Sequence, residues 1–510
     1  MWHRKSVADT MTELLGTTGH LDRSNEIDPV VTVPRKVEDL CIPEGLVHDL
    51  TLKAALVDGR TSTVRLARKL RLNPVVMGRI VEQMRDLKLI EILGIEGHNY
   101  ILTLSERGRQ LANERMQLCR YTGAAPVSLA HYTRVVKAQH VDPDFGIEEL
   151  REAFSDMVVS DQLLAEIGPA AMGKGAMFLY GPPGTGKTSV AERLRRLFKD
   201  HVFIPFAVEV DSQIITVFDP VVHRPAPNQP VGIDGRWVLC ERPFITVGGE
   251  LTKDQLDLSY QAASGTYLAP LQMQANNGIL VIDDFGRQTF RPEELLNRWI
   301  VPLDRHLDYL MLEYGVKFEV PFHCKIVFST NLQPETLGDE AFYRRIQSKV
   351  LIPPVTDEQF EEVLYRAAEA KGVELTPDAP TQLRWMARDV GDGDLRPYLP
   401  WAVLEILEAI CRFEGKPKVL DKGMIERIAN MYFTREAGAE RFELKGEAPD
   451  DLAPPTTAKP RRSLFATPQE ERQEEATSPL SAHLLQAAKR AIAAERQVEE
   501  RSGPESDTDT

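Results

Sequence analysis

Three short apolar runs in the middle of the chain predict buried strands of a parallel sheet. They cover residues 176–180, 279–282 and 326–328, and polar residues follow the second and third at once. Apolar runs of this length are typical of strands that helices cover on both faces. Ligands of such sheets bind at the carboxyl ends of the strands, so the residues after each run are candidates for one common site.

Residues 41–122 carry a different pattern, which predicts a small helical module with a terminal β-hairpin. Segments 45–56 and 62–70 have helical patterns, and residues 74–87 place apolar side chains at helical spacing. Asn73 and Pro74 supply an N-cap and a first helical residue for this third helix. Two apolar runs, 89–93 and 100–104, flank a glycine-containing turn and predict the hairpin.

Pattern and composition divide the whole chain into six parts. Residues 1–40 are polar without a period and predict a flexible arm. Prolines and acidic residues fill the last part, which predicts a disordered acidic tail. The parts are the arm (1–40), the module (41–122), a linker (123–145), an α/β domain (146–353), a helical domain (354–436) and the tail (447–510).

The loop after the first apolar run carries the most specific chemistry of the chain. It fits the phosphate-binding pattern G-x-x-x-x-G-K-[ST] at every fixed position, between a predicted strand and a predicted helix. Glycines let backbone N–H groups turn toward anionic oxygens, while Lys187 is placed to reach the β- and γ-phosphates and Thr188 to bind Mg²⁺. The candidate nucleotide-binding residues are Gly181, Pro182, Pro183, Gly184, Thr185, Gly186, Lys187, Thr188 and Ser189.

The other two apolar runs end in side chains that suit the remainder of a nucleotide site. Asp283 and Asp284 end the second run, and Asn331 follows the third. A carboxylate is a hard oxygen ligand, so Asp283 is expected on the Mg²⁺ side. Asp284 is the candidate for polarising the attacking water, and Asn331 could orient that water or contact the γ-phosphate.

This order of phosphate loop, Asp-Asp strand and Ser-Thr-Asn strand resembles the AAA+ ATPases. The resemblance spans residues 146–436 and implies a P-loop NTPase fold, a three-layer α/β domain with a parallel sheet, followed by a helical lid. It also implies ATP and Mg²⁺ as ligands and ATP hydrolysis to ADP and phosphate as the activity. A helix and hairpin between Asp284 and Asn331 resemble the MoxR-like branch, whereas the Asp-Asp pair looks similar to initiator and helicase-loader ATPases.

The resemblance also implies roles for three arginines in ATP hydrolysis. Arg345, with Arg344 as the alternative, stands where AAA+ proteins carry an arginine finger that reaches the nucleotide of a neighbouring subunit. Arg396 lies in a segment similar to the second sensor motif of the lid and would contact the phosphates. A guanidinium can stabilise the charge of a phosphoryl-transfer transition state. A trans-acting arginine implies a homo-oligomer, usually a hexamer in this family.

Three functions therefore remain open: remodelling of a protein partner by an oligomeric ring, ATP-switched assembly on DNA, or nucleotide sensing without hydrolysis. Many AAA+ proteins have Glu at the position of Asp284. Because Asp is one methylene shorter, it would hold the water less well and hydrolysis could be slow. A sensor needs only Lys187, Thr188 and Asp283, whereas hydrolysis also needs Asp284 and an arginine finger.

The module of residues 41–122 looks like a winged helix, with residues 74–87 as its recognition helix. Residues 41–120 hold thirteen Lys and Arg against nine Asp and Glu, while the whole chain has a net charge of −15. A local positive charge suits DNA contact, for which Arg65, Arg68 and Lys69 are the best phosphate candidates. Winged helices also dock on proteins, and acidic residues interrupt the third helix, so both interpretations stay open.

The cysteines and the apolar runs indicate the cellular compartment in which we expect the protein. The five cysteines are far apart and include no C-x-x-C pair, which indicates reduced thiols rather than a disulfide framework or zinc site. The first ten residues lack the apolar core of a signal peptide, and no apolar run is long enough to span a bilayer. We expect a cytoplasmic protein without a membrane partner. Residues 200–275 resemble an insertion without an assigned role, and His223 and His323 are expected in the core or in loops.

Overall fold

The computed structural model of the protein describes residues 31–97, 99–173, 175–333, 346, 348–390, 393–432 and 444. Most of the predicted arm (1–40) and the predicted tail (447–510) lie outside these residues. The described residues form two compact units. One runs to Glu374 and resumes over Ala387–Val419, and the other holds Leu375–Met386 and continues from Leu420.

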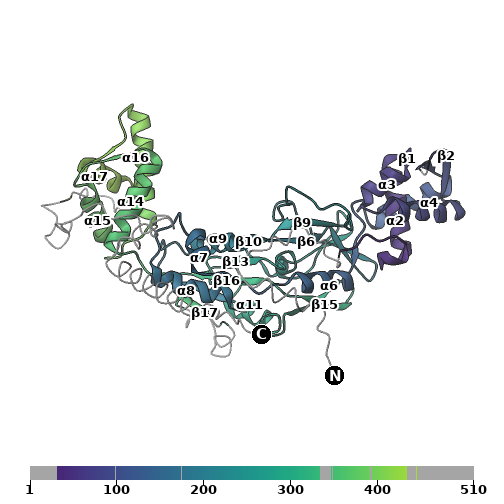
Figure 1. Ribbon diagram of the computed structural model, residues 1–510, viewed down its shortest axis with the longest axis horizontal. Coiled ribbons are helices and arrows are strands. Elements are labelled where there is room, and N and C mark those ends of the chain that lie inside the picture. The colour runs from purple at the N-terminus through teal and green to yellow at the C-terminus, as the bar shows by residue number, and fades with distance from the viewer. Residues whose placement is uncertain are drawn as a thin grey trace, which may run out of the picture. The chain divides into compact units, whose positions relative to one another are not determined.

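The module of residues 41–122 has the three helices and the hairpin that the pattern predicts (Figure 1). Ser62 and Asn73 cap α3 and α4 by accepting hydrogen bonds from Arg65 N and Val75 N. A short strand, β1, and a last helix, α5, are additional elements. The three strands form an antiparallel sheet in the order β1-β3-β2. The elements are α2 (Glu44–Asp58), β1 (Thr61–Ser62), α3 (Thr63–Leu70), α4 (Pro74–Asp86), β2 (Ile90–Glu96), β3 (Asn99–Leu104) and α5 (Glu106–Leu118).

Residues 123–145 are not the linker that their prolines predict. They contain strand β4 (Val127–Ser128) and helix α6 (Leu129–Gln139). Tyr132, Val135 and Val136 are buried on one face of α6, in a core shared with strands far along the chain. Apolar spacing of three and four residues therefore outweighs the breaking effect of the flanking prolines.

A five-stranded parallel sheet forms the centre of the predicted α/β domain, in the order β10-β13-β16-β5-β17. Strand β16 separates the strand before the phosphate loop, β5, from the strand before the two aspartates, β13. The fold class is thus the predicted P-loop NTPase sheet. The strands are β5 (Met177–Tyr180), β10 (Phe244–Val247), β13 (Ile279–Ile282), β16 (Lys325–Thr330) and β17 (Ser348–Leu351).

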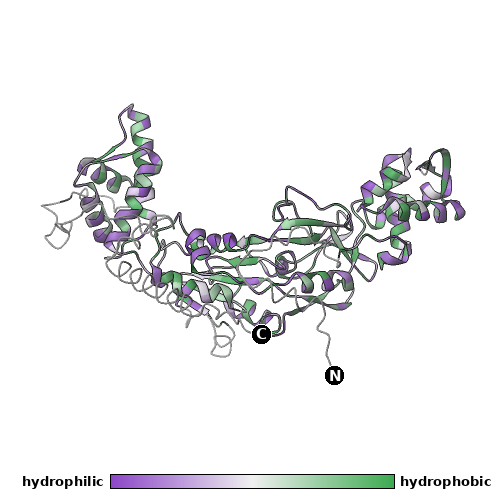
Figure 2. Cartoon of the chain, viewed as in Figure 1, coloured by the Kyte–Doolittle hydropathy of each residue, from purple (hydrophilic) through white to green (hydrophobic). Residues whose placement is uncertain are grey.

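Helices cover both faces of this sheet, which explains its unbroken apolar strands. Leu179, Val281 and Val327 pack with α7 (Ile147–Ala153), α8 (Asp161–Met172) and α9 (Lys187–Leu194). The alternate residues, including Phe178, Ile282 and Phe328, pack with α11 (Pro292–Arg298) and α12 (Ile300–Arg305). Figure 1 shows these helices around the sheet, and Figure 2 shows hydrophobic strands beside helices of mixed hydropathy.

The insertion-like residues 200–275 build most of a β-rich body, whose core also contains side chains from α6 and from the segment 310–320. Strands β6 and β9 form one ribbon, and β11-β12-β8-β7-β4 form a second sheet. The predicted hairpin before Asn331 is β14–β15, and its Leu310 and Val320 lie in the same core as α6. The strands are β6 (His201–Pro205), β7 (Ala207–Val210), β8 (Gln213–Thr216), β9 (Trp237–Glu241), β11 (Ser259–Gln261), β12 (Thr266–Leu268), β14 (Leu307–Met311) and β15 (Lys317–Pro321).

A buried ion pair joins this body to both ends of the module. Asp234 and Arg236 are buried, and Arg236 Nη2 donates to Asp234 Oδ2 at 2.8 Å. Arg236 Nη1 donates to the carbonyl oxygens of Leu40 (3.3 Å) and Pro126 (3.0 Å), just before and just after the module. Both charges thus have hydrogen-bond partners, as buried ions require.

His223 is fully buried, which agrees with the expectation of a core or loop position. Its Nδ1 accepts a hydrogen bond from Asp219 N at 2.9 Å, so its Nε2 is the nitrogen that donates to Gln274 O at 2.9 Å. Burial lowers its pKa, which keeps the ring neutral. His323 is partly buried, with its ring stacked on that of His306 and near the tilted ring of His140, and burial lowers its pKa to about 4.

Residues 354–436 are largely helical where they are described. Thr356 begins the first helix with a reciprocal capping box that involves Gln359. The helices are α14 (Asp357–Lys371), α15 (Ala379–Val390), α16 (Tyr398–Glu414) and α17 (Lys422–Tyr432), with short strands β18 (Glu374–Leu375) and β19 (Val419–Leu420). None of the helices in the described part of the chain is both long and apolar enough to cross a membrane.

Candidate nucleotide site

The phosphate loop lies between β5 and α9, with its glycines in conformations that other residues rarely adopt. Gly181, Gly184 and Gly186 have φ of 144°, 79° and 93°. A Cβ at Gly181 would lie 2.3 Å from the carbonyl oxygen of Ile352, so this position has no room for a side chain. The loop thereby enters α9 at Lys187, where backbone N–H groups without helical partners can bind an anion.

The side chain of Lys187 is buried against the phosphate loop. Its Nζ donates to the carbonyl oxygens of Gly181 (3.1 Å) and Pro182 (2.8 Å). Burial lowers its pKa, and the nearby carboxylates of Asp283 and Asp284 oppose this shift. The lysine is therefore a fixed cation beside two carboxylates, in the place where phosphate oxygens would approach.

Thr188 and Asp283 meet across the sheet edge as a candidate magnesium site. Thr188 Oγ1 donates to Asp283 Oδ2 at 2.7 Å, although the residues are 95 positions apart. Both are hard oxygen donors, which Mg²⁺ prefers. Magnesium keeps several waters and phosphate oxygens at such sites, so two protein ligands fit it. No cluster of three or more His, Cys, Asp or Glu residues suited to a metal occurs among the described residues.

Asp284 and Asn331 also come together, as their strand ends predict. Asn331 Nδ2 donates to Asp284 Oδ1 at 3.2 Å. Asp284 has φ of 46°, an uncommon conformation for a residue other than glycine. Its carboxylate is exposed on the side of the pocket that also holds Lys187 and Thr188, where a water could be held near a phosphate.

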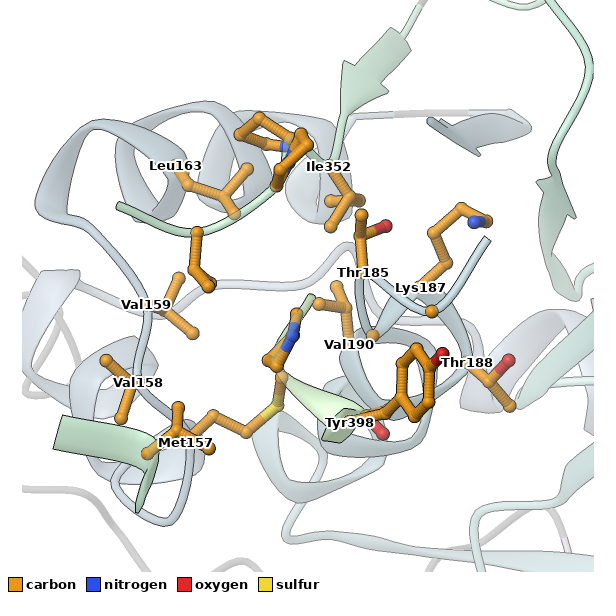
Figure 3. Close-up of a pocket in the computed structure, with 18 of the residues that line it drawn as sticks. Met157, Val158, Val159, Leu163, Thr185, Lys187, Thr188, Val190, Ile352 and Tyr398 are labelled. Carbon is orange, nitrogen blue, oxygen red and sulfur yellow. The ribbon is translucent and has the colours of Figure 1, made fainter. Parts of the chain in front are cut away.

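The whole pocket has a volume of about 750 Å³. Beyond the phosphate loop and the strand ends its lining is largely apolar, and the sequence did not predict this part. Figure 3 shows Met157, Val158, Val159 and Leu163 on one side, Lys187 and Thr188 on the other, and Ile352 beside Thr185 between them. Such a division suits a flat, apolar base at one end and phosphates at the other. In the sequence, only the apolar triplet at 157–159 hints at this apolar wall of the pocket, and the triplet belongs to no recognisable motif.

Asp156 fixes the segment that forms this apolar side. Its carboxylate accepts hydrogen bonds from Arg196 Nη1 (2.7 Å) and Arg193 Nη2 (2.9 Å), both just beyond the phosphate loop on α9 and the turn after it. The hydrogen bond from Arg196 is the main cause that lowers the pKa of Asp156 to about 2. Two arginines therefore hold the base side of the pocket against the phosphate-binding helix.

Residues at the start of α16 complete the pocket. Tyr398 and Trp401 line it, and a Cβ at Gly184 would lie 2.4 Å from the Tyr398 ring. Arg396 lies beside the same glycine, and its Nε is buried with no hydrogen-bond partner among the described residues. Arg396 itself is not among the residues that line the pocket, and its second-sensor role stays a prediction. The candidate finger residues Arg344 and Arg345 lie outside the described residues.

Comparison with known proteins gives two family matches. Residues 154–212 match the family "Magnesium chelatase, subunit ChlI", and residues 356–430 match a domain of unknown function, DUF8689. The chelatase match covers β5, the phosphate loop and α9. Together with the sheet order, it confirms the recognition of an AAA+ P-loop domain. No curated protein matches the chain significantly in sequence.

Solved structures give distant likenesses. The RuvB Holliday junction branch migration motor of Thermotoga maritima is 15% identical, covers 57% of this chain and 72% of its own, and has a TM-score of 0.32. NtrX from Brucella abortus in complex with ATP is 14% identical, covers 72% of this chain and 66% of its own, and also has a TM-score of 0.32.

Proposed function

We propose that this protein binds Mg·ATP in the pocket around Lys187 and hydrolyses it to ADP and phosphate. The contact between Thr188 and Asp283 carries the proposal, because it joins the phosphate loop to the aspartate strand at 2.7 Å. Lys187 and Asp284 lie in the same pocket. These groups are a phosphate-binding cation, two magnesium ligands and a carboxylate able to polarise water.

Each residue has a separate task in this reaction. Lys187 binds the β- and γ-phosphates and neutralises charge as it develops on them. Thr188 and Asp283 would hold magnesium, whose positive charge would offset the negative charge of the phosphates. Asp284 polarises the attacking water, and Asn331 orients the Asp284 carboxylate through the 3.2 Å hydrogen bond. The shorter reach of Asp compared with Glu predicts a slow reaction.

We further propose that the protein acts as a homo-oligomer that remodels a protein partner. The support is the AAA+ domain itself and the positions of Arg345 and Arg344 in the sequence, where a finger for the neighbouring nucleotide is expected. A hexameric ring is the assembly that the family resemblance implies.

The exposed surface of the module favours docking on protein over binding to DNA. Arg65 and Lys69 both pair with Asp58, at 3.2 and 3.1 Å, and Arg79 pairs with Glu82 at 3.0 Å. Cations that are already paired neutralise phosphates poorly. Apolar side chains are instead exposed on α3, on α4 and directly after it, and on β2: Val64, Val75, Leu87, Leu93 and Ile95.

The test is the steady-state ATP hydrolysis rate of the full-length protein with and without duplex DNA. We expect turnover that Lys187→Ala abolishes, that the exposed control Lys199→Ala leaves intact, and that DNA does not change. Unchanged turnover in Lys187→Ala would overturn the site. Stimulation by DNA would support the DNA-switched alternative. ATP binding without turnover would support the nucleotide sensor.

A further inference from the structure

The turn after β13 holds Asp284 in an uncommon conformation between two neighbouring strands. Asp283 N still donates to Val247 O of β10 at 2.7 Å, whereas Phe285 N donates to Ser329 O of β16 at 2.8 Å. The chain thus crosses from one neighbour to the other within two residues. Asp284 lies at the crossing point, with φ of 46°. Such a backbone conformation persists only where the surrounding structure fixes it.

The side-chain amide of Gln288 makes the contacts that fix this turn. Its Nε2 lies 3.1 Å from Asp283 O, 3.3 Å from Asp284 O and 3.3 Å from Gly248 O. Its Oε1 accepts a hydrogen bond from Gly286 N at 2.8 Å. Since Gly248 directly follows β10, one partly buried amide connects the ends of two adjacent strands and both aspartate carbonyls.

From this geometry we propose that Gln288 is the positioning residue for the Asp284 carboxylate. This inference rests on the proposed function, in which Asp284 polarises the attacking water. The Asp284 side chain is exposed, and Asn331 can orient it through the 3.2 Å hydrogen bond only if the backbone of the turn places the carboxylate within reach. An aspartate also has one fewer rotatable bond than a glutamate, so it cannot compensate for a displaced backbone.

Replacement of Gln288 should therefore slow the chemical step without weakening ATP binding. Gln288→Met keeps the length of the side chain and removes its hydrogen bonds. We expect kcat to fall about ten- to hundredfold, the loss typical of a misplaced reacting group. The Kd for Mg·ATP should stay unchanged, because Lys187 and Thr188 keep their contacts. Thr289→Ala, at the exposed neighbouring position, is the matched control and should keep its kcat.

A second variant covers the case in which the first fails to fold. Gln288→Glu keeps the acceptor for Gly286 N and loses the donors to the three carbonyl oxygens. The same loss of kcat with normal ATP binding is expected. A parallel rise in Kd, or an unchanged kcat in a variant that binds ATP normally, would overturn the positioning role.

A double variant separates this inference from the proposed function. If Gln288 acts through Asp284, Gln288→Met should cause no further loss of kcat in an Asp284→Asn background. A multiplicative loss would show that Gln288 acts by another route. Full turnover in Asp284→Asn alone would overturn the proposed role of Asp284. If the single variant Asp284→Asn is inactive while the single variant Gln288→Met keeps the kcat of the wild type, only the inference about Gln288 is overturned.

Discussion

Asp156 offers a test of how the base side of the pocket is held. Its carboxylate receives hydrogen bonds from Arg193 and Arg196, and its pKa is lowered from 3.8 to about 2. At 1.36 kcal/mol per pKa unit, this shift corresponds to about 2.4 kcal/mol. The side chain is 42% exposed, so solvent screening reduces the contribution to about 1 kcal/mol.

Asp156→Asn removes the charge and keeps the approximate shape of the side chain. If the arginines hold residues 157–159 in their binding conformation, loss of about 1 kcal/mol should raise the Kd for Mg·ATP about fivefold. Isothermal titration calorimetry measures this change directly. Glu152→Gln is the control, because Glu152 pairs with Lys199 at 2.9 Å while both side chains are 69% exposed. Such an exposed pair contributes little.

The difference in Kd between the wild type and Asp156→Asn should depend on pH in a way that follows from the lowered pKa of Asp156. A carboxylate with a lowered pKa stabilises the fold above its unfolded-state pKa, and this contribution is lost as the pH falls toward 2. The difference between the wild type and Asp156→Asn should therefore stay constant from pH 7 to about 5 and shrink only below the ordinary aspartate range. Equal Kd values for Asp156→Asn and Glu152→Gln would refute the reasoning, as would a difference that titrates near neutral pH.

Three further outcomes are expected. Thr188→Ala should raise the magnesium concentration needed for half-maximal turnover while ATP alone still binds, and an unchanged magnesium titration would contradict the metal site. Arg345→Ala should remove turnover and leave ATP binding intact, and full activity would reject the arginine finger. Arg236→Met leaves Asp234 as an uncompensated buried charge, so stability should fall by about 3–5 kcal/mol. Thermal unfolding measures that loss, and a midpoint equal to that of the wild type would contradict it.

The sequence predicts the phosphate end of the site because its residues follow local rules. A glycine-rich loop between a strand and a helix specifies Lys187 and Thr188 by position alone. Asp283 and Asn331 follow from the rule that parallel strands present their carboxyl ends at one edge. The contact between Thr188 and Asp283 is the structural counterpart of that prediction.

The base end of the pocket could not be predicted in the same way. Asp156 and Tyr398 take their roles from partners far away in sequence, which no local pattern specifies. Residues 123–145 are not a linker, because the apolar face of α6 packs in the core although prolines flank the helix. The roles of Arg344 and Arg345 stay predictions.

The hydrogen bonds of Arg236 have a consequence for the modularity of the chain. Because one guanidinium binds both Leu40 O and Pro126 O, the chain leaves the body that holds Arg236 and returns to it at neighbouring points. A segment whose ends meet can be gained, lost or exchanged without a break in the path of the surrounding polypeptide. A short bridge from Leu40 to Pro126 should thus preserve the path of the body without residues 41–125, and Ala207 and Ile214, which pack in the core of the module, would then need polar replacements.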